Sequence, residues 1–183
     1  MASYTDKLTD AEAMGIISQV EGVFKGLPHL PSGIVDFLVK IAPYMALISG
    51  ILALLAGPVI GLLGGLGSIL SLSPILMIST LGSAVVMIIS AILMLMAFGP
   101  LKNRQMKGWI FLFWSEALSI VNLIFTLMLG ETSGLVGGVI GILIGFYVLF
   151  EMKSRYTAAG QVVAAAKSAA KKMGEVVEGE KVE

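Results

Sequence analysis

Residues 41–101 read IAPYMALISGILALLAGPVIGLLGGLGSILSLSPILMISTLGSAVVMIISAILMLMAFGPL and contain no Asp, Glu, Lys, Arg or His. The hydrocarbon core of a bilayer is about 30 Å thick, and a helix needs roughly 20 residues to cross it. The stretch therefore has room for two membrane crossings and a connection between them. A charge-free run of this length exceeds what the core helices of a small soluble domain require. The sequence predicts an integral membrane protein.

The composition of the whole chain agrees with this class. Hydrophobic residues make up 57% and charged residues 13% of the 183 residues, and the mean hydropathy is +0.96. The 12 basic and 12 acidic residues cancel, which argues against a nucleic-acid partner, because phosphate binding needs a local excess of Lys and Arg. The chain has no Cys, so thiolate catalysis and Cys-based metal sites are excluded. Acids near the N-terminus replace the basic region of a signal peptide, so we expect no cleavage there.

Four apolar blocks predict an all-α membrane protein built as a four-helix bundle. The blocks are residues 44–66, 74–98, 109–129 and 135–150. The last block is short for a crossing. It is completed either by the Gly-rich turn before it or by Glu151 and Lys153 extending to the interface. If it stays at the interface instead, the chain has three crossings and an external C-terminus.

Basic residues gather on one side of these blocks. A hairpin between the second and third blocks carries three of them, and the others flank the first and fourth blocks: Lys40, Lys102, Arg104, Lys107, Lys153 and Arg155. The other two connections, 67–73 and 130–134, have no Lys or Arg. By the positive-inside rule, we expect the basic hairpin and both termini in the cytoplasm, with the protein integral to the plasma or inner membrane.

The flanking segments predict amphipathic helices, and the chain divides into residues 1–40, 41–156 and 157–183. In residues 4–26 apolar side chains recur at helical spacing. A second helix starting at Ser32 suits the membrane surface, and Pro43 marks the start of the first crossing. The tail has an apolar face of small residues, so it lies on the membrane or docks on a protein partner or a second copy.

Two glycine ladders with four-residue spacing occur in the first and fourth blocks. Their members are Gly57, Gly61, Gly65, Gly137, Gly141 and Gly145. Such spacing gives a helix a groove without side chains, into which a second backbone can pack. The pattern, a glycine zipper, predicts helix packing within one chain or between copies. For the Gly- and Ser-rich segment from Gly64 to Pro74, we expect an outer loop in preference to a re-entrant loop.

Glu116 is the one ionisable residue well inside a predicted crossing. With Asn122 nearby in sequence it forms a possible intramembrane polar site for a proton or cation. The alternative is an anchor that pairs with Lys107 or Arg104 or reaches the interface. A proton relay would lack its next member, because the predicted crossings hold no other acid and no His.

The sequence offers no catalytic, cofactor-binding or metal-binding residues. The sole histidine, His29, lies between two prolines without a second metal ligand or a nucleophile. Phosphate-binding glycine loops and paired carboxylates are also missing. We therefore expect a non-enzymatic membrane component with an assembly or interaction role, whose partners are the bilayer, its own copies or other membrane proteins. The alternative is a small channel or transporter for an ion or small solute, acting as an oligomer.

Overall fold

The computed structural model describes residues 4–70, 72–128, 130, 132 and 134–156. These residues form five helices and the connections between them, without a strand. The chain divides after Pro31 into two compact units. The predicted amphipathic tail, 157–183, lies outside the described residues.

The first unit contains one helix, α1, from Tyr4 to Phe24. This agrees with the helical spacing of apolar residues in the sequence. The helix ends in a turn in which the Leu27 amide donates to the Phe24 carbonyl at 3.1 Å. Pro28 follows at once, and a proline disfavours helical angles at the residue before it. The location of α1 at a membrane surface stays a prediction.

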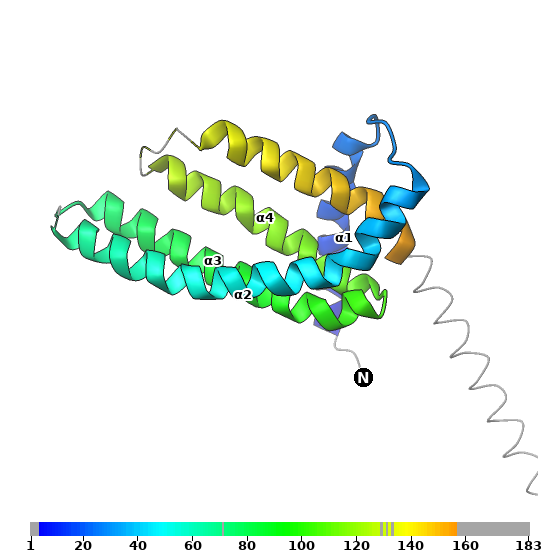
Figure 1. The fold of residues 1–183 in the computed structure, drawn as a ribbon, viewed down its shortest axis with the longest axis horizontal. Coiled ribbons are helices and arrows are strands. Elements are labelled where there is room, and N and C mark those ends of the chain that lie inside the picture. Colours follow the sequence, from blue (N-terminus) through cyan, green and yellow to red (C-terminus); the bar gives the residue numbers. More distant parts are fainter. Residues whose placement is uncertain (1–3, 71, 129, 131, 133, 157–183) are drawn as a thin grey trace, which may run out of the picture. The chain divides into compact units, whose positions relative to one another are not determined.

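The second unit consists of four helices that are long and apolar enough to cross a membrane. They are α2 (Ser32–Leu70), α3 (Pro74–Lys102), α4 (Met106–Met128) and an unlabelled helix, Leu135–Tyr156. Figure 1 shows them beside one another, with successive helices running in opposite directions along the horizontal of the view and the unlabelled helix, in yellow and orange, next to α4. The all-helical architecture and these four long apolar helices confirm that part of the predicted fold class and indicate a membrane protein.

Helix α2 is longer than the sequence predicts at both ends. It passes through Pro43 and Pro58 without ending, so the expected division between residues 40 and 41 falls inside a continuous helix. The outer loop expected between Gly64 and Pro74 is shorter than predicted, because α2 continues to Leu70 and α3 begins at Pro74. In hydrocarbon every backbone amide needs an internal partner, which favours helix even where Gly and Ser are frequent.

The connections between helices are short and start or stop each helix locally. The Ser73 hydroxyl accepts the Leu76 amide at 3.4 Å as the N-cap of α3, and Pro74 occupies the first turn, where its missing amide costs nothing. After α3, the Asn103 amide donates to the Gly99 carbonyl at 3.1 Å, and Arg104 has a φ of 51°. This tight turn makes α3 and α4 antiparallel neighbours.

The last described helix is also longer than its apolar block. It spans the 22 residues Leu135–Tyr156, so it continues through Glu151 and Lys153. The predicted block ended at residue 150 because charged residues begin there. The extra turns carry those charges to the end of the helix, which gives the block the length of a crossing.

Helix α3 packs against both α2 and α4. Its buried residues are mainly small: Ser79, Thr80, Ala84, Ala91, Ala97 and Leu101. Lipid offers no hydrophobic drive for helices to associate, so small side chains stabilise a membrane bundle by letting backbones approach closely. Helix α3 is therefore the central packing element of the second unit.

Candidate functional site

The first glycine ladder lies against α3. A Cβ atom built on Gly61 would stand 2.9 Å from the Ala84 Cβ, and one on Gly57 would stand 3.2 Å from the Ile88 Cγ1. Neither position has room for a side chain unless α3 or its side chains move. Gly65 differs, because a Cβ there would meet its nearest leucine side-chain carbon at 3.8 Å, an ordinary contact.

Two further glycines extend this contact, and the sequence analysis missed both. A Cβ on Gly50 would stand 3.1 Å from the Ala91 carbonyl oxygen, and one on Gly64 would overlap the Thr80 side chain. These glycines lie seven residues before and after Gly57. A seven-residue repeat is the spacing that keeps one face of a helix against a neighbour over several turns. The seven-residue spacing of Gly50, Gly57 and Gly64 was the sequence signal that could have identified this packing face.

The second ladder does not form one contact surface within the chain. Gly145 faces α4, and Gly138, outside the ladder, would place a Cβ 3.1 Å from the Leu123 Cδ1. Gly137 and Gly141 are exposed and have nothing within 4 Å of a built Cβ. The structure therefore separates the ladder into an inward Gly145 and an outward pair.

Two pairs of polar side chains connect α3 and α4. The Ser83 hydroxyl donates to the Asn122 side-chain oxygen at 2.5 Å, and the hydroxyls of Ser90 and Ser115 are 2.6 Å apart. The two pairs lie seven residues apart on each helix, and the order is opposite on α3 and α4. They therefore fix one antiparallel register of the two helices. Asn122 is thus engaged with α3.

The Glu116 side chain lies on a different face of α4. Its carboxylate covers Gly145, where a built Cβ would stand 2.6 Å from the carboxylate carbon. Six residues along a helix amount to a rotation of about 240°, so Glu116 and Asn122 do not form one site. Within the described residues the Glu116 carboxylate makes no ion pair with Lys107 or Arg104.

Aromatic side chains hold α4 against the Leu135–Tyr156 helix next to Glu116. The buried Trp109 indole donates to the Leu149 carbonyl at 2.7 Å. Phe113 packs against Phe146 and Phe150, with ring centroids 5.6 and 6.1 Å apart. These contacts fix how the two helices face each other, and with it the position of Glu116 over Gly145.

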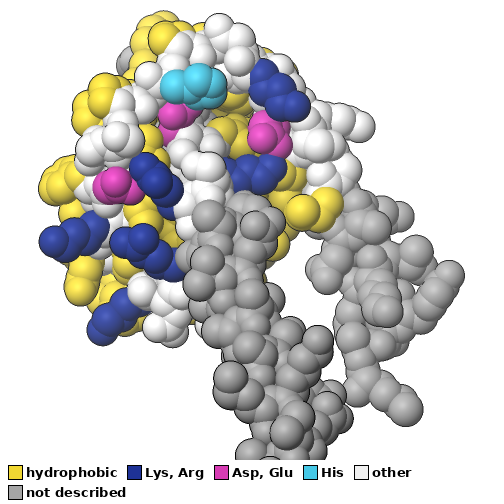
Figure 2. Space-filling view, turned by 90° about the vertical axis from the view of Figure 1, so that its right-hand side faces the viewer, with side chains coloured by type: hydrophobic (Ala, Val, Ile, Leu, Met, Phe, Trp, Pro, Cys, Tyr) yellow, Lys and Arg dark blue, Asp and Glu magenta, His cyan; other side chains and the backbone are white. Residues whose placement is uncertain are grey.

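The basic residues of the second unit lie at one end of its bundle. Figure 2 looks onto this end and shows Lys and Arg side chains at the surface. The Arg155 Nε and the Asp36 Oδ1 are 3.1 Å apart, which connects the Leu135–Tyr156 helix to α2. Both side chains are partly exposed, so the pair adds little stability. The basic hairpin of Lys102, Arg104 and Lys107 is exposed to solvent.

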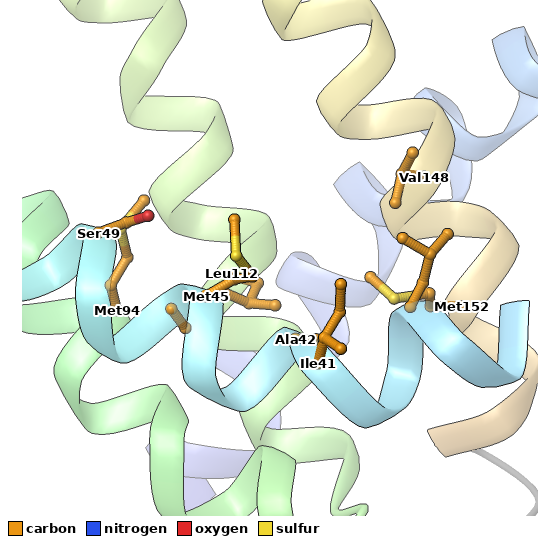
Figure 3. Close-up of a pocket in the computed structure, with 10 residues that line it drawn as sticks. Ile41, Ala42, Met45, Ser49, Met94, Leu112, Val148 and Met152 are labelled. Atoms are coloured by element: carbon orange, nitrogen blue, oxygen red, sulfur yellow. The ribbon is translucent and has the colours of Figure 1, made fainter. Parts of the chain in front are cut away.

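A cavity of about 300 Å³ lies between the helices near this end. Figure 3 shows its walls, to which all four long helices contribute. One lining side chain, Ser49, carries a polar atom, and none is charged. The lining residues are Leu38, Ile41, Ala42, Met45, Ala46, Ser49, Met94, Leu112, Val148 and Met152.

The described residues contain no group of three or more His, Cys, Asp or Glu side chains that could hold a metal ion. Comparison of the chain with protein-family models, with curated proteins and with solved structures finds no match. Functional inference therefore depends on the geometry of the chain itself.

Proposed function

We propose that this chain is a non-enzymatic membrane component that associates, in the bilayer, with its own copies or with another membrane protein. The observation that supports this role is the outward pair Gly137 and Gly141 on the Leu135–Tyr156 helix. Both have open space around them. By contrast, α3 covers four glycines of α2: Gly50, Gly57, Gly61 and Gly64.

The surface around this pair suits close contact between helices. Val136, Ile140 and Ile144 flank it, and each has half or more of its surface exposed. These side chains and lipid tails are equally apolar, so their exposure alone gives no drive to associate. Two glycines four residues apart do favour association, because a second helix can approach their backbone closely and gain van der Waals contact.

The orientation that we propose places the basic end of the second unit in the cytoplasm. Its support is the clustering of the six Lys and Arg residues at that end, while the described residues of the other two connections carry none. Cytoplasmic connections are enriched in Lys and Arg because translocating them is unfavourable. The glycine pair then lies in the half of the bilayer away from the cytoplasm.

The test is the mass of the full chain in mild detergent, measured by analytical ultracentrifugation for the unmodified protein and for Gly141→Leu. We expect an assembly larger than one chain, and a shift toward the single chain in the variant at unchanged thermal stability. Ile144→Leu, which changes an exposed side chain on the same helix without adding bulk, is the matched control and should keep the assembly. A single chain at every detergent concentration contradicts association between copies, and an assembly that Gly141→Leu leaves intact contradicts the role of the glycine pair.

A further inference from the structure

We infer that the cavity between α2 and the Leu135–Tyr156 helix binds a small lipophilic cation, an organic amine with an apolar body, whose ammonium group pairs with Glu116. This binding site does not depend on the association proposed above. It combines two features of the second unit: an apolar cavity and the Glu116 carboxylate, which lies one helical turn of α4 beyond the cavity-lining Leu112.

The cavity suits an apolar body. Its volume of about 300 Å³ is at the lower end of the roughly 300–1,000 Å³ found for small-molecule sites. Methionine side chains from three helices, Met45, Met94 and Met152, form part of its wall (Figure 3). Such flexible, polarisable side chains adapt to ligands of different shape. The lining predicts that the cavity selects its ligands by their hydrophobicity and size.

The Glu116 carboxylate lies one helical turn deeper than the cavity wall. Leu112 lines the cavity, and Glu116 follows it four residues later, which on a helix is about 6 Å further along and about 40° around. On the facing helix Val148 lines the cavity, and Gly145, which the carboxylate covers, precedes it by three residues. Ser49 is the deepest lining residue of α2. The Ser49 hydroxyl thus lines the inner end of the cavity, and the Glu116 carboxylate lies one helical turn beyond that end.

The chemistry at this end favours a cation. The Glu116 carboxylate has no ion-pair or hydrogen-bond partner within the described part of the chain. The basic residue before it on α4, Lys107, is nine residues away, or roughly 14 Å along the helix. A charge in a membrane interior is costly unless a partner compensates it. An ammonium group supplies that partner, whereas an anionic amphiphile would be repelled.

The cavity opens to the outer surface of the bundle. Met45 lines it and is 57% exposed, so the opening lies beside α2, in the part of the helix that crosses the membrane. Lipophilic amines partition into bilayers, because their apolar bodies leave water while the ammonium group stays near the headgroups. Such a molecule reaches the opening from the lipid without crossing the protein.

The test compares a cation with its uncharged analogue on the full chain in lipid nanodiscs. The probes are 4-phenylbutylammonium and 4-phenylbutanol, which share the apolar body. Binding is measured by isothermal titration calorimetry, with empty nanodiscs subtracted to remove partitioning into lipid. We expect saturable binding of the ammonium at one molecule per chain, and binding of the alcohol at least tenfold weaker.

Three variants assign this binding to the site. Glu116→Gln keeps the side-chain shape. It should weaken binding of the ammonium at least tenfold and leave binding of the alcohol unchanged. Ala46→Leu fills the cavity from α2, away from Glu116, and should abolish saturable binding of both probes. Glu151→Gln removes an acid at the end of the bundle and should change neither.

Several results would overturn the inference. Equal affinity for the two probes would show that the cavity takes neutral chains, such as the acyl chain of a lipid. Ammonium binding that survives both Glu116→Gln and Ala46→Leu would place the site elsewhere. If Glu116→Gln fails to fold, the comparison of the two probes on the unmodified chain and the effect of Ala46→Leu still decide the question.

Discussion

Replacing Gly61 by Ala tests whether the α2–α3 contact depends on glycine. The added Cβ would stand 2.9 Å from the Ala84 Cβ, whereas carbon atoms in favourable contact are about 3.5–4.0 Å apart. The helices must therefore move apart by more than half an ångström at this point or shift along each other. Adding a methylene-sized group to a packed core costs about 1–3 kcal/mol.

Gly65→Ala is the matched control, because it makes the same chemical change one turn along the same helix. Its Cβ would meet the nearest side-chain atom at 3.8 Å, so no overpacking is expected. Both variants gain helix propensity from Ala, worth up to about 1 kcal/mol. That gain cancels in the comparison, so Gly61→Ala should be less stable than Gly65→Ala by about 1–3 kcal/mol.

The free energy of unfolding of each variant is measurable in mixed micelles by titration with a denaturing detergent. Fluorescence of Trp109 and Trp114, both on α4, reports the loss of the bundle. Ala84→Gly should restore part of the stability of Gly61→Ala, since it removes the opposing methyl group. Equal stability of the two alanine variants, or no energetic coupling between positions 61 and 84 in the double-mutant cycle, would refute the close contact.

Further expectations concern topology and the contacts of α4. Reporter fusions at Gln105 and at the C-terminus should indicate the cytoplasm and a fusion within 67–73 the opposite side; an external C-terminus would contradict the orientation. Trp109→Phe keeps an aromatic ring but loses the indole hydrogen bond to the neighbouring helix, so the free energy of unfolding should fall by about 1 kcal/mol, with an unchanged value arguing against that bond. Ser83→Ala should cost roughly 0.6–1.7 kcal/mol, and this loss should largely disappear in an Asn122→Ala background if the two side chains are coupled.

The sequence alone identified the four helices that are long and apolar enough to cross a membrane. Transfer of a peptide segment into hydrocarbon depends on the summed character of about 20 residues, so charge-free blocks identify membrane helices without any tertiary information. The positions of the helix ends depend on more than this summed character. Gly, Ser and Pro near residues 58–70 signal loops in water, yet α2 continues to Leu70, because in a bilayer the backbone has no solvent with which to bond.

Only the tertiary structure decided which side chains meet. The four-residue spacing of Gly137, Gly141 and Gly145 gave no sign that Gly145 faces Glu116 while the other two face outward. That outcome depends on the rotation of one helix against another, which the aromatic packing around Trp109 fixes.

The contacts of the intramembrane polar residues were likewise decided only by the tertiary structure. Glu116 and Asn122 are six positions apart in sequence, but the helical rotation between them directs Asn122 to Ser83 on α3 and Glu116 to the Leu135–Tyr156 helix. The apolar cavity could not be predicted at all, because its walls come from four helices. Hydropathy along one chain records how much of each helix is apolar, and the gaps between packed helices arise only when their surfaces are brought together.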